Sequence, residues 1–307
     1  MTRVAAIDCG TNSVRLLIAD VADGGLTDVE RRLEIVRLGQ GVDRTGRLAP
    51  EALERTFGAM RGYAKLIKEH GASPVRVVAT SATRDAANRA DFVTGVREIF
   101  GVEPEVVTGA EEARLSFVGA TTGLTGVEPP VLVFDIGGGS TEFVLGAETV
   151  ENVLSVDIGC VRLTERHLAS GVTPRAVAAA SADIDAALDR VAAEVPVERA
   201  RTVIGLAGTV TTIAGIALDA PAYDPERNHG ARIEAARVHE ISRRLLAMSH
   251  DERAAIPVMH PGRVDVIGAG GLILDHILAR FGFSELLVSE HDILDGLAYS
   301  LYESSSR

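Results

Sequence analysis

The chain contains the stretch VAAIDCGTNSVRLLI at residues 4–18 and repeats it, slightly altered, as VLVFDIGGGSTEFVL at residues 131–145. Superposing the two copies places Asp8 on Asp135, an offset of 127 residues. Each copy consists of an apolar run, an acidic residue, a glycine-containing turn and a second apolar run. This pattern predicts one β-hairpin in each copy.

The turn in each copy has the composition of an anion-binding loop. Gly, Ser and Thr let successive backbone N–H groups converge on one point, and such nests attract anions. The aspartate before the turn would repel a phosphate, so we expect it to hold a divalent cation or to orient a water molecule. One such turn alone is ordinary in a hairpin. Duplication with the acid and the small residues in register favours a function, and two such hairpins across a cleft would bind a polyphosphate.

Length and composition restrict the classes of protein to consider. A chain of 307 residues suits two domains. Its 46% hydrophobic and 24% charged residues are typical of a soluble globular enzyme. Trp is absent and the formal charge is −12, which argues against a nucleic-acid partner. A polyanion must therefore be bound locally, by backbone amides, a metal ion and a few arginines.

The cysteines and the apolar segments indicate a cytoplasmic protein. Cys9 and Cys160 are too few for a disulfide scaffold. We do not expect Cys9 to be a nucleophile, because nothing near it in sequence would lower its pKa. The apolar stretch from Val4 is broken at Asp8, unlike a signal peptide. The longest uncharged segment, 202–218, is shorter than the ~20 residues of a membrane span, so we expect no membrane contact.

Strands alternate with helices along the rest of the chain, which predicts the α/β class. Pro50 precedes a helix whose apolar positions step by three and four residues and which ends at Gly71. The other predicted elements are a strand at 75–79, a polar turn at 80–84, a strand ending at 106–107, a strand at 153–156, a helix from Pro174 to about Val195 capped by Thr173, a strand, turn and helix at 202–218, a turn and helix at 264–278, and a strand, acidic turn and final helix at 284–303.

A segment rich in Gly and Pro at 123–130 is the predicted hinge between two domains. We therefore expect one α/β domain at residues 1–124 and another at residues 125–292, with a cleft between them. The final helix, 293–307, is expected to cross back to the first domain.

Five motifs, taken in order and spacing, resemble the exopolyphosphatase and guanosine pentaphosphate phosphohydrolase (Ppx/GppA) family, and the resemblance covers the whole chain. It implies the duplicated ribonuclease-H-like domains of the actin, sugar kinase and Hsp70 superfamily. It also implies a homodimer that hydrolyses a terminal phosphoanhydride of inorganic polyphosphate. The motifs are DCGTNS (8–13), TSATR (80–84), GAEEAR (109–114), DIGGGSTE (135–142) and GLAGT (205–209).

The resemblance assigns roles to two side chains of the first domain. Glu112 matches the family's general base and Arg84 its substrate-phosphate arginine. Thr108 and Glu111 have the spacing of a capping box, so Glu111 is explained as a helix N-terminal residue and is kept as the alternative base. In the implied mechanism Glu112 deprotonates a water for in-line attack on the end phosphorus. Metal, Arg84 and turn amides take up the charge on the leaving chain.

Acidic residues around the turns are the expected metal ligands. Asp135 and Glu142 flank the second turn, and in a hairpin both carboxylates can face a Mg²⁺ bound to substrate oxygens. Asp8 would supply a third carboxylate from the other domain, so we expect activity to need Mg²⁺ or Mn²⁺. The expected phosphate contacts come from Asn12, Ser13, Gly137, Gly138, Gly139, Ser140, Thr141, Gly208 and Thr209.

Several alternatives remain at this point. Guanosine pentaphosphate presents the same terminal anhydride as polyphosphate. A sugar kinase or ATPase would use the same turns, with GAGG at 268–271 as its adenosine motif, and a non-catalytic sensor would bind without hydrolysis. The HD dipeptides at His250 and His291 are typical of metal phosphohydrolases, but an upstream histidine at fitting spacing is not evident. Longer family members carry a further helical domain after this point, so we expect a preference for short polyphosphates.

Overall fold

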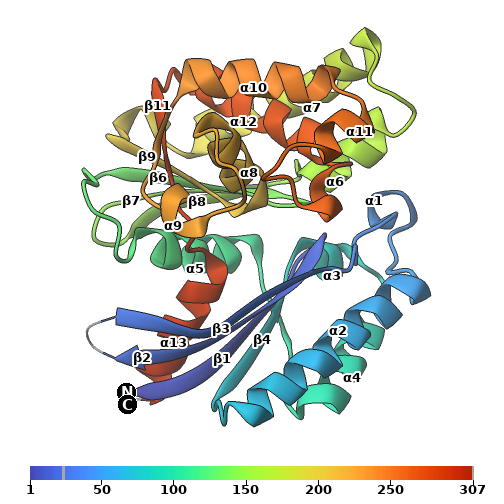
Figure 1. The fold of residues 1–307 in the computed structure, drawn as a ribbon, viewed down its shortest axis with the longest axis vertical. Coiled ribbons are helices and arrows are strands. Elements are labelled where there is room, and N and C mark those ends of the chain that lie inside the picture. The colour runs from blue at the N-terminus through green and yellow to red at the C-terminus, as the bar shows by residue number, and fades with distance from the viewer. Residues whose placement is uncertain (23–24, 306–307) are drawn as a thin grey trace. The chain divides into compact units, whose positions relative to one another are not determined.

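Both predicted hairpins are present, and each lies in a different unit of the chain. The computed structural model describes residues 1–22 and 25–305. Its chain divides into a first unit, Met1–Gly123 with Asp292–Arg307, and a second unit, Leu124–His291. Each unit has one mixed β-sheet with helices packed on it, so the predicted α/β class is confirmed (Figure 1).

The sheet of the first unit has the strand order β3-β2-β1-β4-β5. The first three strands are antiparallel neighbours, whereas β1, β4 and β5 run parallel. This is the order of a ribonuclease-H-like sheet. The strands are β1 (Thr2–Cys9), β2 (Ser13–Ala22), β3 (Gly25–Ile35), β4 (Val75–Ala79) and β5 (Glu105–Val106).

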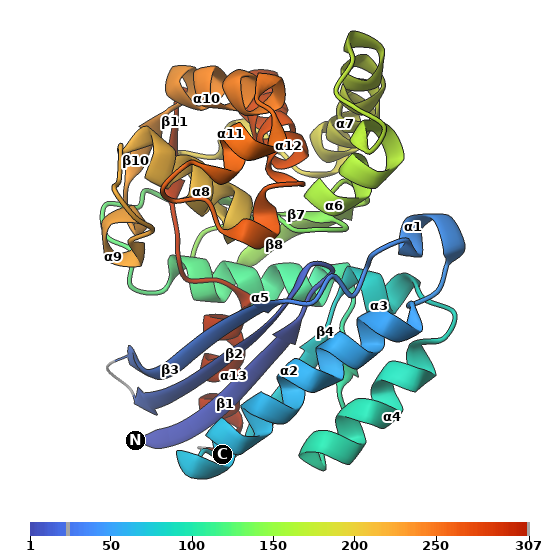
Figure 2. The same cartoon turned by 45° about the vertical axis from the view of Figure 1, so that its right-hand side comes forward.

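Helices cover both faces of this sheet, because alternate side chains of β1 point to opposite sides. Ile7 packs in a core with α2 and α4, and Ala6 packs in a second core with α5 and α13 (Figure 2). The helices of the unit are α1 (Val42–Thr45), α2 (Pro50–Glu69), α3 (Ser81–Asp85), α4 (Arg89–Phe100), α5 (Gly109–Thr121) and α13 (Ile293–Ser305).

Helices α5 and α13 approach each other closely because each has a glycine at the contact. A Cβ added at Gly119 would lie 1.8 Å from the carbonyl oxygen of Asp292. A Cβ added at Gly296 would lie 2.1 Å from the carbonyl oxygen of Leu115. Any larger side chain at either position would force the helices apart. The last helix of the chain thereby completes the core of the first unit.

The sheet of the second unit has the order β10-β11-β9-β6-β7-β8. Strand β6 is antiparallel to β7 and parallel to β9, and β11 is parallel to β9. Read from β8, the order repeats that of the first unit, with β10 as an added edge. The strands are β6 (Val131–Ile136), β7 (Thr141–Gly146), β8 (Val150–Val156), β9 (Thr202–Leu206), β10 (Arg232–Glu234) and β11 (Glu285–Val288).

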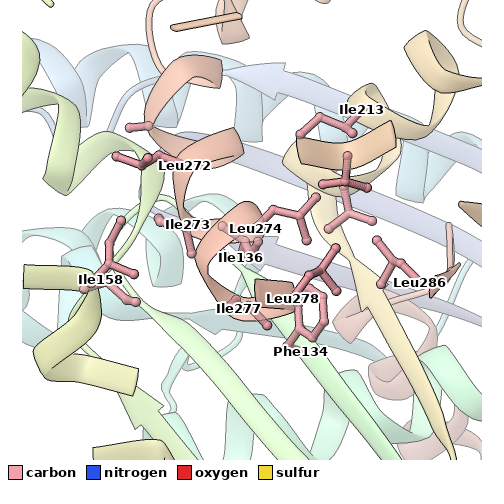
Figure 3. Close-up of a cluster of buried hydrophobic side chains, with 14 of the residues drawn as sticks. Phe134, Ile136, Ile158, Ile213, Leu272, Ile273, Leu274, Ile277, Leu278 and Leu286 are labelled. Atoms are coloured by element: carbon pink, nitrogen blue, oxygen red, sulfur yellow. The ribbon is translucent and has the colours of Figure 1, made fainter. Parts of the chain in front are cut away.

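A large apolar core lies between this sheet and its helices. Phe134 and Ile136 of β6 pack with Leu274 and Leu278 of α12 (Figure 3). The helices are α6 (Cys160–Leu163), which continues as a π-helical turn at Thr164–Leu168, α7 (Pro174–Glu194), α8 (Ala207–Ala217), α9 (Pro225–Asn228), α10 (Ala235–Ala247), α11 (His250–Ala254) and α12 (Ile267–Phe281), with short 3₁₀ turns at Val197–Arg199 and Pro261–Arg263.

Most local predictions are confirmed and one is wrong. The helix beginning at Pro50 is present, and Thr173 caps α7, since its hydroxyl oxygen accepts a hydrogen bond from the backbone N–H of Ala176 at 3.2 Å. The segment 80–84, predicted as a polar turn, instead forms α3. Its small residues pack as a helical turn directly after β4. No described helix combines the length and apolar character needed to span a membrane.

Candidate functional site

Three of the predicted motifs meet at one edge of the first sheet. Strands β1, β4 and β5 are parallel, so their carboxyl ends lie together. The first turn follows β1, α3 with Arg84 follows β4, and α5 with Glu112 begins shortly after β5. The strand order of the fold thereby collects groups that are about a hundred residues apart in sequence.

In the first turn all the carbonyl groups of residues 11–13 accept hydrogen bonds, whereas two backbone N–H groups remain open. Gly10 donates its backbone N–H to the carbonyl oxygen of Ser13 at 2.9 Å, which closes the turn. The carbonyl oxygens of Thr11 and Asn12 accept N–H groups from the segment 36–39 at 2.8 to 3.1 Å. Within the described chain, the N–H groups of Thr11 and Asn12 donate no hydrogen bond.

The second turn has the same arrangement. Gly137 donates its backbone N–H to the carbonyl oxygen of Ser140 at 3.0 Å. The carbonyl oxygens of residues 137–139 accept bonds from the start of α6 and from Nε of Arg162, the last at 2.6 Å. The N–H groups of Gly138, Gly139 and Ser140 have no hydrogen-bond partner among residues 1–22 and 25–305.

These two turns therefore have the properties of nests for an anion. Their carbonyl groups are fixed from one side, and several adjacent N–H groups remain available. The close approach of α6 depends on Gly159, where a Cβ would lie 2.4 Å from the carbonyl oxygen of Gly138. Thr141 contributes no further donor, because its hydroxyl already donates to the carbonyl oxygen of Ile158 at 2.7 Å.

Asp8 is a buried carboxylate with one open oxygen. Only 4% of the residue is exposed. Its Oδ2 accepts a bond of 2.7 Å from Nη2 of Arg15, its cross-strand neighbour. Its Oδ1 accepts no hydrogen bond from any described residue. Burial raises the pKa of Asp8, and the positive charge of Arg15 opposes that shift.

Arg15 also contacts a second buried carboxylate, that of Asp292. Asp292 directly precedes α13, and its Oδ1 accepts the backbone N–H of Leu294 at 3.0 Å. Burial alone would raise the pKa of Asp292, but Arg15 and Arg31 reverse this, so the pKa lies below its usual value. The sequence predicted neither contact, because the partners are 277 residues apart.

Glu112 and Arg84, which the sequence singled out separately, form an ion pair. Nη1 of Arg84 donates to Oε2 of Glu112 at 3.1 Å and to the carbonyl oxygen of Val107 at 2.9 Å. Glu112 is buried, with 8% of the residue exposed. Glu111 is more exposed, and its backbone N–H donates to Thr108 Oγ1 at 3.2 Å, as expected for the start of a helix. The two neighbouring glutamates thus occupy different environments.

Asp135 and Glu142 are directly opposite each other in the second hairpin. Cross-strand partners place their side chains on the same face of a sheet. Both residues are buried, and Oε1 of Glu142 accepts the hydroxyl of Ser155 at 2.7 Å. The predicted proximity of these two carboxylates is therefore a property of the strand register.

The described residues contain no group of three or more His, Cys, Asp or Glu side chains that is arranged to hold a metal ion. The donor chemistry nevertheless suits a hard cation, because the candidates are all carboxylates and Oδ1 of Asp8 is open. Asp8 belongs to the first unit, whereas Asp135 and Glu142 belong to the second.

A third turn joins β9 to α8 in the second unit. Leu206 is paired with Asp135, so this turn lies beside the second hairpin. The structure also places Arg263 there, a residue that the sequence analysis did not identify. A Cβ added at Gly208 would lie 2.4 Å from Cζ of Arg263, so glycine makes room for the guanidinium. Nη1 of Arg263 donates to Thr212 Oγ1 at 3.1 Å.

Three weaker sequence features have positions in the structure that do not suggest a reactive site. GAGG at 268–271 lies inside the buried part of α12, where Gly270 approaches Thr209. Cys9 and Cys160 are buried, and burial raises the pKa of Cys160 to about 11, which disfavours a reactive thiolate. His250 with its neighbouring aspartate is exposed on α11.

Comparison with known proteins identifies consistent relatives. The model of the Ppx/GppA phosphatase family matches residues 17–305. The chain is 50% identical to a Mycobacterium tuberculosis protein named exopolyphosphatase 2, over 98% of this chain and 99% of that protein. It is 29% identical to the guanosine-5'-triphosphate,3'-diphosphate pyrophosphatase of Aeromonas salmonicida, over 97% of this chain but 59% of that protein. A crystal structure of an exopolyphosphatase-like protein superposes with a TM-score of 0.95 at 41% identity, covering both chains completely.

Proposed function

The chain belongs to the Ppx/GppA phosphatase family, and we propose that it is an exopolyphosphatase that removes the terminal phosphate of inorganic polyphosphate. The prediction of a hydrolase in this family is confirmed by the family match and by the half-identical relative. The observation that carries the substrate class is the pair of turns with open N–H groups. Each turn presents donors to phosphate oxygens without adding a fixed charge.

In this proposal Glu112 is the general base. A water molecule attacks the end phosphorus, Glu112 accepts its proton, and the bridging P–O bond breaks with its electrons going to the shortened chain. Arg84, which pairs with Glu112 at 3.1 Å, is proposed to donate to an oxygen of the transferred phosphoryl group. Glu111, which starts the helix, remains the alternative base.

The turns are proposed to bind the non-reacting phosphate oxygens. Fixed N–H donors stabilise developing negative charge without reorganising during the reaction. The donors assigned to this role are the N–H and O–H groups of Asn12, Ser13, Gly138, Gly139, Ser140, Gly208 and Thr209. Two of the predicted residues supply none, because the N–H of Gly137 donates to Ser140 and the hydroxyl of Thr141 donates to Ile158.

A divalent cation is proposed to complete the substrate complex. Mg²⁺ or Mn²⁺ would neutralise part of the phosphate charge when bound. The carboxylates of Asp8, Asp135 and Glu142 are the groups that we assign to it, and the open Oδ1 of Asp8 supports this assignment. The homodimer and the cytoplasmic location stay predictions.

Guanosine pentaphosphate is the alternative substrate, since one relative is named for a guanosine-5'-triphosphate,3'-diphosphate pyrophosphatase activity. We favour polyphosphate because the more similar relative, at 50% identity, is named an exopolyphosphatase. Short chains are the preferred substrate in this proposal. A protein with a formal charge of −12 repels a long polyanion everywhere except at local sites.

The test is the initial rate of orthophosphate release from tripolyphosphate, long-chain polyphosphate, guanosine pentaphosphate and ATP, each with Mg²⁺, with Mn²⁺ and with EDTA. We expect the highest kcat/KM with a short polyphosphate and no activity in EDTA. If guanosine pentaphosphate were hydrolysed with a higher kcat/KM than any polyphosphate, it would be the substrate instead. Tight polyphosphate binding without any release would identify a sensor and contradict the proposal.

A further inference from the structure

A groove in the first unit carries unpaired positive charge on a chain that is acidic overall. It is a hollow of about 580 Å³ between α1 and the start of α2. We propose that this groove binds phosphate units of a polyphosphate chain that lie beyond the reacting end. The inference rests on the proposed function, because it extends the substrate contacts of that same enzyme. The groove adds affinity only for the units that reach it, and the formal charge of −12 still disfavours much longer chains.

Three exposed arginines, Arg44, Arg47 and Arg55, line the groove. The guanidinium groups of the first two form no ion pair or hydrogen bond with another residue of the described chain. Arg55 also lines the groove, but its Nε donates to the carbonyl oxygen of Val36 at 3.0 Å and its Nη2 lies 3.5 Å from Gln40 Oε1. Arg55 therefore fixes the loop, while Arg44 and Arg47 remain available to a ligand.

The loop that forms the groove continues directly from the first phosphate turn. Gly39 donates its N–H to the carbonyl oxygen of Thr11 at 2.8 Å. Gln40, the next residue, already lines the groove. Glycine is required here, since a Cβ at Gly39 would lie 2.3 Å from Cγ2 of Thr11. A chain bound at the turn would thus find the groove along the same backbone segment.

The other side of the groove is tied to the segment that follows Arg84. The backbone N–H of Ala87 donates to the carbonyl oxygen of Gly46 at 2.9 Å. Asn88 Oδ1 accepts the N–H of Leu48 at 2.8 Å. These bonds hold the arginine-bearing loop in a fixed position relative to α3, so the groove is a preformed feature of the first unit.

A second hollow, of about 460 Å³, lies next to the groove along α2. It shares Arg47, Leu48 and Pro50 with the groove, but Glu54 and Asp91 balance the charges of its two arginines. The excess of positive charge is therefore a property of the groove, where an extended polyanion can contact Arg44 and Arg47 in succession.

The lining of the groove favours inorganic phosphate over a nucleotide. Its charged residues are three arginines and a single glutamate, Glu51. It has no aromatic residue on which a base could stack. Guanidinium groups bind phosphate oxygens through paired donors. Glu51 lies in the first turn of α2, where the helix dipole stabilises its charge. The net lining charge is thus positive on a chain whose formal charge is −12.

The test compares polyphosphates of different length on a protein that cannot turn them over. We would measure binding of tripolyphosphate, long-chain polyphosphate and guanosine pentaphosphate by calorimetry in the Glu111→Gln/Glu112→Gln background, which removes both candidate bases, with and without Arg44→Gln/Arg47→Gln. Arg97→Gln is the matched control, because Arg97 is an exposed arginine of the same unit that lies outside the groove and pairs with Glu103. Thermal unfolding of each variant checks its fold.

We expect the double substitution to weaken binding of long polyphosphate about tenfold and that of tripolyphosphate by less than about threefold. Arg97→Gln should change neither. Equal weakening at both lengths, or none, would overturn the proposal. A loss confined to guanosine pentaphosphate would also overturn it. Because binding is measured without turnover, these results are independent of whether the wild-type protein hydrolyses polyphosphate and whether Glu112 is its base.

Discussion

Arg15 is the residue that connects the first hairpin with the last helix. Its guanidinium lies between the buried carboxylates of Asp8 and Asp292. Oδ1 of Asp8 accepts no hydrogen bond from any described residue and is the position that we propose for a cation. The arrangement therefore supports both the folded state of the first unit and the role that we propose for Asp8.

The substitution Asp292→Asn tests this arrangement. The asparagine side chain would still cap α13, because Asn and Asp are equally good N-caps, so the substitution isolates the charge. Removing one partner of a buried ion pair costs about 3 kcal/mol. We expect the free energy of unfolding at pH 7, measured with urea, to fall by that amount. Asp20→Asn, which removes the partner of Arg3 in the same sheet, is the control and should cost less.

The same variant has a defined pH dependence. The pKa of Asp292 is lowered in the folded state, so its ionised form stabilises the protein above the unfolded-state pKa of about 3.9. That stability is lost as the pH falls through the lower, folded-state pKa. The difference between wild type and Asp292→Asn should shrink below about pH 4. A difference that stays constant across this range would contradict the assignment of the charge effect to Asp292.

Among the secondary-structure elements, the β-hairpin with its turn occurs once in each unit, as β1–β2 and as β6–β7. In both copies the carbonyl groups of the turn are bound by a neighbouring segment, and the N–H groups stay open. The neighbour differs, since the segment after β3 serves the first turn and α6 serves the second. The common property is therefore the open amides, and the supporting segments have diverged.

The contact of α5 with α13 gives a prediction about helix packing. We expect Gly119→Ala to lower the free energy of unfolding by about 1–3 kcal/mol, because its Cβ would overlap the carbonyl oxygen of Asp292. Gly58→Ala is the matched control. Gly58 lies in α2 with open space around it, and alanine there should stabilise the helix by about 0.5–1 kcal/mol. Chemical denaturation of both variants measures the change in the free energy of unfolding. An unchanged value for Gly119→Ala would show that α5 and α13 can move apart without loss of stability.

The elements also show which parts of the fold are predictable from sequence. The two hairpins were predictable because an apolar run, an acid and a glycine turn recur in register. Strand β3 (Gly25–Ile35) was not predicted, since it lies at the sheet edge and alternates charged residues with few apolar ones. Helix α3 was read as a turn because five residues are too few for a helical period to appear.

At the scale of the whole molecule, the chain closes the first unit with its last helix. Ile293, Leu294 and Leu297 lie in the same core as Val4 of the first strand. The catalytic candidates Glu112 and Arg84 were predicted from the resemblance of their motifs to a family, since neither stands out by its local sequence alone. The contacts of Arg15 with Asp292 and of Arg263 with Gly208 could not be predicted, because they depend on residues brought together only by the tertiary fold.

Glu112 is proposed as the base of a polyphosphate hydrolase, and orthophosphate release by two neighbouring variants tests this assignment. Glu112→Gln should lower kcat for short polyphosphate by about 10²-fold or more, as expected for a lost general base. Glu111→Gln is the control, since Glu111 lies on the same helix in a more exposed position. Its kcat should stay near that of the wild type. A large loss in Glu111→Gln with activity retained in Glu112→Gln would contradict the account.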